Sequence, residues 1–364
     1  MPTIADPGRP VTGGVDTHAE VHVAGMVDQA GRVLGTKEFP ATAVGYAAAL
    51  AWIRGHGELA KVGVEGTGSY GAGLARYLAA RGIEVTEVIR PNRQARRRRG
   101  KSDPADAVAA ALAALNGEAS GQPKSGDGAV ESIRALQVAR RGAVKARTQA
   151  GHQLRDLIIT APQVLREKLA ALPAPQRVKL ATRFRPGDLT NPAEAAKAAM
   201  ATVARRHQAL TAEIAQLDTA LETLLGHAAP AGFLAKTGVG ARSAATLLIT
   251  AGDNPARLRT EASFAALCGA SPVDASSGKQ RRHRLNRGGD RQANSALWRI
   301  VFTRMATDPR TQAYVARRTS EGKTTREIIR CLKRYVAREV YKALTAHTRQ
   351  LNQDPATQIH SMIT

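Results

Sequence analysis

Four acidic residues stand where the sequence predicts the ends of strands or the start of a helix. Asp16 ends a valine-rich segment in "GVDTH", and Glu65 ends a later one in "GVEGTGSYG". Asp103 and Asp106 open the segment "DPADAVAAALAAL", which is rich in strong helix formers. Because the ends of adjacent strands lie close together and residues three apart share a helix face, we expect the four carboxylates to converge.

A cluster of four carboxylates repels itself unless cations neutralise it, and Mg²⁺ prefers oxygen ligands of this kind. Two such ions held about 4 Å apart stabilise the attacking and leaving oxygens of a phosphoryl transfer. The pattern therefore predicts a catalytic magnesium site whose ligands are Asp16, Glu65, Asp103 and Asp106. Each residue also has a plainer interpretation. Asp103 before Pro104 is typical of a helix N-cap, Asp106 suits the helix dipole, and Asp16 could shape a strand end.

The densest positive charge of the chain lies directly before this pair of aspartates, in "QARRRRGKSDPADA". A solvated, salt-bridged helix would interleave its charges rather than block them. We therefore predict that the run binds nucleic-acid phosphates close to the carboxylates. The residues concerned are Arg96, Arg97, Arg98, Arg99 and Lys101.

The overall composition supports a polyanionic partner. Lys and Arg total 53 against 30 Asp and Glu, so the formal net charge of the 364 residues is +23. Nucleic acid is the commonest partner of so basic a chain, with a membrane surface as the rival. Since no apolar run approaches 18 residues and no signal peptide is recognisable, a cytoplasmic, bacterial-type protein is expected. Two cysteines are too few for a disulfide framework, and 4% aromatic residues argue against a broad base-stacking platform.

The elements that must position the carboxylates form an α/β pattern. Three valine-rich strands are predicted within residues 11–40, followed by a helix over 43–57, a strand over 61–66, a helix over 71–82, a strand over 83–89 and the helix that begins at Asp103. This domain is expected to end near residue 118, because residues 117–128 ("GEASGQPKSGDG") have the composition of a linker.

The middle of the chain is predicted to be helical. Apolar residues recur every three or four positions at Val203, Leu210, Ile214, Leu217, Leu221 and Leu224, with His207 in the remaining slot. This period of about 3.5 residues is typical of a coiled coil or helix bundle. The partner helix is expected around residues 129–160, in the same chain or in a second subunit. We assign His207 no chemistry, since a lone histidine at such a position is usually a tolerated core residue.

The last part contains a second candidate for phosphate binding. In "FLAKTGVGARSAATLLITAG", the turn Gly238-Val239-Gly240 before an alanine-rich segment is typical of a helix–hairpin–helix motif, whose glycines let backbone amides approach a phosphate. The loop "CGASPVDASSGKQRRHRLNRGGDRQ" follows, and helices rich in arginine run to about residue 348. The predicted nucleic-acid-binding residues of this loop are Lys279, Arg281, Arg282, Arg284 and Arg287.

Taken in this order, "VDTH", "VEGTGSYG", "KSDPADA", "TGVGARSAATLL" and the "GASPVDASSGK" loop resemble the DEDD transposases of the insertion-sequence-110 family. The resemblance implies a ribonuclease-H/RuvC-like α/β domain over residues 1–118, a linker and helical coiled-coil region over 119–230, and a mainly α C-terminal transposase domain over 231–364. It also implies a serine nucleophile. Ser277 matches that position, with Ser276 as the fallback.

For activity, the resemblance implies an enzyme that cuts and exchanges DNA strands with Mg²⁺ to move an insertion sequence. The implied partners are donor and target duplex DNA, a structured noncoding guide RNA and further copies of the chain in a dimer or tetramer. Two other classes stay open. One is a RuvC-like, structure-selective nuclease that uses the carboxylates alone. The other is a nucleic-acid-binding protein whose catalytic site has decayed.

Overall fold

The computed structural model describes residues 9–88, 102–119, 121–278 and 283–353. The first part alternates strands and helices as predicted. Its elements are β1 (Pro10–Thr17), β2 (Val21–Asp28), β3 (Val33–Pro40), α1 (Ala43–Arg54), β4 (Glu58–Glu65), α2 (Ala72–Ala79), β5 (Val85–Val88) and α4 (Asp103–Leu115).

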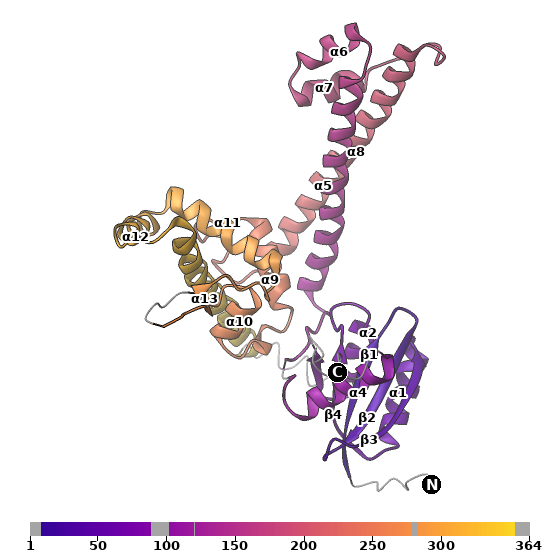
Figure 1. Cartoon of the computed structure of the whole chain (residues 1–364), viewed down its shortest axis with the longest axis vertical. Helices are drawn as coiled ribbons and strands as arrows, with labels where there is room; N and C mark the ends of the chain where they lie inside the picture. The colour runs from indigo at the N-terminus through magenta and orange to yellow at the C-terminus, as the bar shows by residue number, and fades with distance from the viewer. Residues whose placement is uncertain (1–8, 89–101, 120, 279–282, 354–364) are drawn as a thin grey trace. The chain divides into compact units, whose positions relative to one another are not determined.

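The five strands form one mixed sheet in the order β3-β2-β1-β4-β5 (Figure 1). The first three strands pair antiparallel, whereas β4 runs parallel to β1, and β5 runs parallel to β4. Strand β1 is therefore central, and its carboxyl end lies beside that of β4. Every residue of β1 after Pro10 is buried, as expected for a strand with both faces covered.

Helix α4 covers one face of the sheet by resting on a row of three glycines. Gly14 of β1 pairs in register with Gly25 of β2 and with Gly63 of β4. A β-carbon at Gly25 would lie 2.9 Å from the backbone nitrogen of Val108, and one at Gly63 would lie 2.5 Å from the carbonyl oxygen of Ala110. The helix backbone thus lies directly on the sheet, which fixes where the start of α4 is held.

The opposite face of the sheet packs against α1 and α2. Alternate strand residues point to opposite faces, so Val15 and Ala24, the neighbours of the glycines, point away from α4. They pack with Leu50 of α1 and Leu74 of α2 in one hydrophobic cluster, together with Val62, Val64, Leu78 and Val85.

The chain divides into two compact units, and the first of them is discontinuous in sequence. It contains residues 1–128 and 251–263, whereas the second contains residues 129–250 and 264–364. The predicted linker contributes to the first unit. The side-chain amide of Asn254 donates to the carbonyl of Pro123 (3.0 Å), and its oxygen accepts from the backbone nitrogen of Ser125 (3.1 Å). The three-part domain division expected from the sequence stays a prediction.

Two long helices of the second unit, α5 (Ala129–Ile159) and α8 (Pro192–Ala228), pack against each other. Pairing of Arg140 with Asp218 and of Gln153 with Arg206 shows that they run antiparallel. The prediction of a partner helix at 129–160 is confirmed, and the partner belongs to the same chain. Ile214 and Leu221 of the predicted seam are buried, and Val203, Leu210, Leu217 and Leu224 are half-buried. The short helices α6 (Gln163–Ala170) and α7 (Ala174–Ala181) connect the pair.

The rest of the chain is mostly helical, as predicted. Its elements are α9 (Ala241–Ala251), the 3₁₀ turn η1 (Pro255–Arg257), α10 (Glu261–Leu267), the two-residue strands β6 (Val273–Asp274) and β7 (His283–Arg284), α11 (Arg291–Thr307), α12 (Pro309–Ser320) and α13 (Thr325–Gln353). Strands β6 and β7 pair antiparallel within the region predicted to be a loop.

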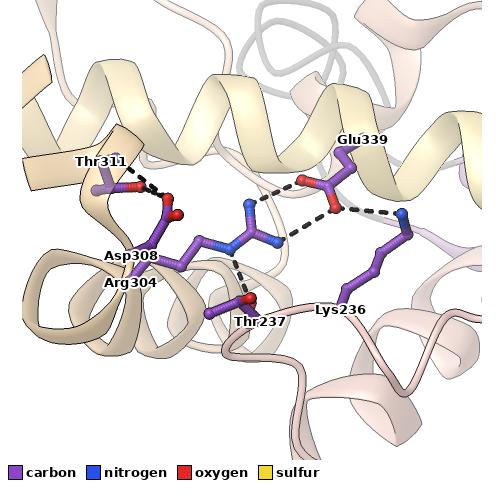
Figure 2. A network of polar contacts seen from close by, with 6 residues as sticks. All are labelled: Lys236, Thr237, Arg304, Asp308, Thr311 and Glu339. Carbon is purple, nitrogen blue, oxygen red and sulfur yellow. Dashed lines mark hydrogen bonds and ion pairs between the residues drawn. The ribbon is translucent and has the colours of Figure 1, made fainter. Parts of the chain in front are cut away.

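A polar network joins α11, α13 and the turn before α9 (Figure 2). The guanidinium of Arg304 donates to both carboxylate oxygens of Glu339 (2.7 and 3.2 Å) and to the carbonyl of Thr237 (2.7 Å). The ammonium of Lys236 lies 3.3 Å from the same carboxylate. These contacts attach the turn at Gly238 to the two helices.

None of the described helices combines the length and the low polarity that crossing a bilayer would require.

Candidate active site

Two of the predicted carboxylates meet at the carboxyl end of the central strand, on either side of one imidazole. Nε2 of His18 lies 3.2 Å from Oδ2 of Asp16 and 3.5 Å from Oδ2 of Asp103. Asp16 is supplied by the end of β1 and Asp103 by the first turn of α4. One ligand atom from each of these three residues lies within 4.8 Å of the others, so the group could hold a metal ion.

Asp106 adds charge to the same place. It lies one helical turn beyond Asp103 in α4 and is buried. Burial raises the pKa of Asp16, and the negative charges of Asp106 and Asp103 raise it further, while His18 acts in the opposite direction. The carboxylates are thus near enough to repel one another, and a bound cation would reduce that repulsion.

Glu65 lies at the end of the neighbouring strand β4. The hydroxyl of Thr17, next to Asp16 in the chain, donates to the backbone carbonyl of Glu65 (2.9 Å) and ties the two strand ends together. Since Gly63 faces α4, the alternation of strand residues places Glu65 on that face as well. Among the described residues, the group whose ligand atoms meet within 4.8 Å contains neither Glu65 nor Asp106.

The donor set fits a divalent cation. Carboxylate oxygens suit Mg²⁺, Ca²⁺ and Mn²⁺, whereas an imidazole nitrogen is the commoner ligand of softer transition metals. Asp16 has a raised pKa because its charge is buried beside other carboxylates, and a bound cation would relieve that cost. The residues therefore suit a divalent ion without singling out magnesium.

His18 belongs to the site, although the sequence analysis assigned it no role. One signal was visible, namely a titratable side chain two residues after Asp16 at a strand end. Its contact with Asp103 forms only because α4 packs on β1, although the two residues are 85 positions apart in the sequence. No local sequence pattern indicates that they are close in space.

The two candidate serines occupy the connection between β6 and β7 and differ in their contacts. Ser276 is held in a turn, because its backbone nitrogen (2.8 Å) and its hydroxyl both donate to Oδ1 of Asp274. These hydrogen bonds lower the pKa of Asp274, which makes that carboxylate a weak base. Ser277 is exposed, and Gly278 follows it with a positive φ of 55°.

The two glycines before α9 have different surroundings. Gly238 adopts a φ of 79°, and a β-carbon there would lie 2.9 Å from the carbonyl of Ile300, whereas nothing lies within 4 Å of one at Gly240. Both glycines line a cavity of about 710 Å³. Its other lining residues include the cations Lys236, Arg242 and Arg299 and the carboxylates Asp218 and Glu222.

Of the remaining predicted nucleic-acid-binding residues, Arg284 lies in β7 and Arg287 just after it, and both are exposed. The others lie outside the described residues. They are Arg96, Arg97, Arg98, Arg99, Lys101, Lys279, Arg281 and Arg282.

Comparison with known proteins gives matches over both parts of the chain. A family model of the DEDD type, described as a transposase, matches residues 13–160. A second model, described as the transposase IS116/IS110/IS902 family, matches residues 233–316. An insertion element IS110 uncharacterized 43.6 kDa protein of Streptomyces coelicolor is 32% identical over 133 residues. The matched region covers 36% of this chain and 32% of that relative.

Proposed function

Because the chain belongs to the IS116/IS110/IS902 family of transposases, we propose that it cuts and exchanges DNA strands to move an insertion sequence. The observation that carries the proposal is the meeting of Asp16 and Asp103 around His18, with Asp106 beside them. Carboxylates at the carboxyl edge of a mixed sheet in the order β3-β2-β1-β4-β5 are what a ribonuclease-H/RuvC-like nuclease domain needs.

We assign Mg²⁺ as the ion that Asp16, Glu65, Asp103 and Asp106 hold. When bound, it would neutralise charge that develops on the oxygens of the phosphate under attack. The protein's own part is to fix the ligands. The glycine row seats α4 on β1, and Thr17 ties the end of β4 to that of β1. Nε2 of His18 lies between the two aspartates, 3.2 Å from Oδ2 of Asp16 and 3.5 Å from Oδ2 of Asp103.

We assign Ser277 as the nucleophile. In this step its Oγ bonds to the phosphorus, the bond from phosphorus to one sugar oxygen breaks, the hydroxyl proton passes to a base and the leaving sugar oxygen gains a proton. The resulting phosphoester bond to serine keeps the energy of the broken phosphodiester bond for rejoining. Both serines are exposed, but the hydroxyl of Ser276 is already bonded to Asp274, which favours Ser277. Gly238, Gly240, Arg284, Arg287 and the basic residues outside the described ranges are proposed to bind phosphates.

The proposed partners follow from the same assignment. They are donor and target duplex DNA, a structured guide RNA transcribed from the element, and further copies of the chain, in the bacterial cytoplasm. A chain with a net charge of +23 is suited to holding several nucleic-acid backbones, while base pairing with the RNA would select the sequence.

Incubating the full chain with a donor plasmid, a target plasmid, the element's transcript and Mg²⁺ tests the proposal. Sequencing should detect joined donor–target junctions. Asp103→Asn should lower their yield by more than the roughly 100-fold typical of changes around a metal site, and a chelator should abolish them. Junctions that form equally well with chelator or with Asp103→Asn would refute the metal assignment. Cut but unjoined DNA would favour the alternative of a structure-selective nuclease.

A further inference from the structure

Helix α13 separates an apolar face from a strongly basic one. Its buried residues recur every four positions, at Ile328, Leu332, Val336, Val340 and Leu344. The other face carries Arg330, Arg334 and Arg338, also four apart. A basic stripe on a helix is usually just a solvated face. Here the stripe lines a cavity instead.

The cavity has a volume of about 440 Å³ and is formed by three segments of the second unit. Its lining residues come from residues 269–272, from residues 283–286, and from α12, α13 and the turn between these two helices. Among the described lining residues, seven carry a positive charge and one carries a carboxylate. The cations are Arg284, Arg318, Lys323, Arg330, Lys333, Arg334 and Arg338, and the carboxylate is that of Glu327.

The carboxylate of Glu327 is hydrogen-bonded to Thr324 at the start of α13. Its Oε2 accepts hydrogen bonds from the backbone nitrogen (2.9 Å) and the hydroxyl (2.8 Å) of Thr324. The backbone nitrogen of Glu327 donates in turn to the hydroxyl oxygen of Thr324 (3.4 Å), which completes a capping box. The backbone hydrogen bond from Thr324 is the main cause that lowers its pKa, so this carboxylate stays charged and engaged. The lining of the cavity therefore carries more positive than negative charge, which suits an anionic ligand.

Lys333 carries one of these charges in a buried position. Its side chain is 5% exposed, and Nζ donates to Oδ1 of Asn294 (2.9 Å), a neutral acceptor. The amide of Asn294 is itself fixed by the carbonyls of Cys268 (2.9 Å) and Gly269 (3.0 Å). Among the described residues no carboxylate pairs with this ammonium, and an ammonium has three donors. A buried cation without a counter-ion is costly, which points to an anionic ligand.

Arg318 supplies a second unfilled donor. Its Nη1 pairs with Glu321, but within the described part of the chain its buried Nε has no hydrogen-bond partner. The side chain also lies over the ring of Tyr314, with 6.0 Å between the guanidinium carbon and the ring centroid.

Tyr335 adds an aromatic surface to the basic cavity. Its ring is half exposed and packs edge-on against Tyr314, with 5.7 Å between the centroids. Arginines beside an exposed aromatic ring are the usual means of binding unpaired nucleotides, whose bases stack on the ring. A cavity of this size lies within the ~300–1,000 Å³ of ligand pockets, so it admits a nucleotide or two of one strand but not the width of a duplex.

We propose that this cavity binds a single, unpaired nucleic-acid strand, with its phosphodiester groups on Arg284, Arg330 and Lys333 and a base on Tyr335. The inference deepens the proposed function, on which it rests for the identity of the ligand as nucleic acid. DNA and RNA share the phosphodiester chemistry, and the experiment distinguishes the two.

Binding of the full chain to fluorescent 12-nucleotide strands of DNA and RNA, and to the corresponding DNA duplex, is measured by anisotropy in chelator. Arg330→Gln and Arg284→Gln change two different segments of the cavity lining, and each should weaken strand binding about tenfold or more. Each should also reduce the slope of log affinity against log salt by about 0.7. Arg326→Gln is the matched control, because exposed Arg326 is on the same helix and does not line the cavity.

Tyr335→Leu should weaken strand binding at least about fivefold, whereas Tyr335→Phe should retain it, since the ring alone stacks. Loss with only one of the two strand types identifies DNA or RNA as the ligand, and loss with both identifies the shared backbone. Equal losses for Arg330→Gln and Arg326→Gln, or equal losses for strand and duplex, would overturn the proposal. Because the experiment measures binding and requires no cleavage, the result does not depend on whether the chain transposes DNA.

Discussion

A β-carbon added to Gly14 would lie 2.1 Å from the backbone nitrogen of Ala111, so strand β1 and helix α4 are in direct backbone contact. Gly14 precedes Asp16 by two residues on the same face of the sheet. Ala111 belongs to the helix that begins at Asp103. The close contact therefore sets the distance between the two aspartates that meet at His18.

Gly14→Val should destabilise the chain by about 3 kcal/mol or more, the upper range for overpacking, because the obstructing atoms are backbone and cannot rotate away. Denaturant unfolding followed by circular dichroism measures the change. Gly68→Ala is the control, since nothing lies within 4 Å of a β-carbon there, and it should shift stability by less than about 0.5 kcal/mol. Equal effects of the two changes would show that the glycine row does not seat the helix.

Asp16→Asn should stabilise the metal-free protein at pH 7. Folding raises the pKa of Asp16, chiefly by burial, so its charged form costs free energy in the folded state. The advantage of the variant should be full above the raised pKa and vanish below the unfolded value of about 3.9, where the wild-type carboxyl is protonated. Thermal unfolding in chelator from pH 3 to pH 8 measures it.

Added Mg²⁺ should make the wild type more stable than Asp16→Asn. An ion at 100 times its dissociation constant stabilises the wild type by about 2.7 kcal/mol, and the variant should lose most of that gain. Glu20→Gln, an exposed change in the turn after β1, should respond to Mg²⁺ like the wild type. If Mg²⁺ raised the unfolding temperature of Asp16→Asn as much as that of the wild type, Asp16 would not be a ligand.

Glu339→Gln should destabilise the chain at neutral pH by about 1–2 kcal/mol, because it weakens the charged hydrogen bonds with Arg304 and the pairing with Lys236. Hydrogen bonding to Arg304 lowers the pKa of Glu339. The stabilisation is thus present above the unfolded pKa of about 4.3 and lost as pH falls through the lower folded value.

The difference between wild type and Glu339→Gln in denaturant midpoint should therefore shrink between pH 5 and pH 3. Glu213→Gln, an exposed change on α8, serves as the control and should stay within about 0.5 kcal/mol at both ends of the range. A difference that does not change with pH would mean that the glutamate acts through packing rather than through its charge.

Ser277→Ala should abolish a covalent protein–DNA adduct on a suicide substrate, while Ser276→Ala should retain it. One exposed hydroxyl contributes little to stability, so both variants should remain folded. Denaturing gel electrophoresis detects the adduct, and peptide mapping locates it. An adduct that persists in Ser277→Ala and maps to Ser276 would shift the nucleophile by one residue. Strand joining without any adduct would assign the chemistry to the carboxylates alone.

Local signals predicted the secondary structure around the site well. The helix expected from Asp103 to Leu115 has those bounds, because Pro104 fixes its start and the alanine-rich run favours it. The three valine-rich segments before residue 41 form β1, β2 and β3. Short strands were harder to predict. Strands β6 and β7 have two residues each, and their pairing depends on chain reversal rather than on a hydrophobic pattern.

Contacts between distant residues were beyond reach of the sequence. The glycines at 14, 25 and 63 look unrelated until the register of three strands places them in one row. The role of His18 depends on Asp103, and the basic cavity depends on Arg284 approaching the face of α13 that carries Arg330. In each case the residue types were visible, but their proximity is a product of the fold.

The participation of residues 251–263 in the first unit has a consequence for the evolution and engineering of the gene. A single crossover between two related genes, anywhere among the codons for residues 129–250, would combine the first 128 residues of one parent with Asn254 of the other. The hydrogen bonds that Asn254 makes with Pro123 and with Ser125 would then join residues inherited from different parents. Functional chimeras should consequently require two exchanged segments, and natural recombinants should inherit residues 122–125 and 251–257 together.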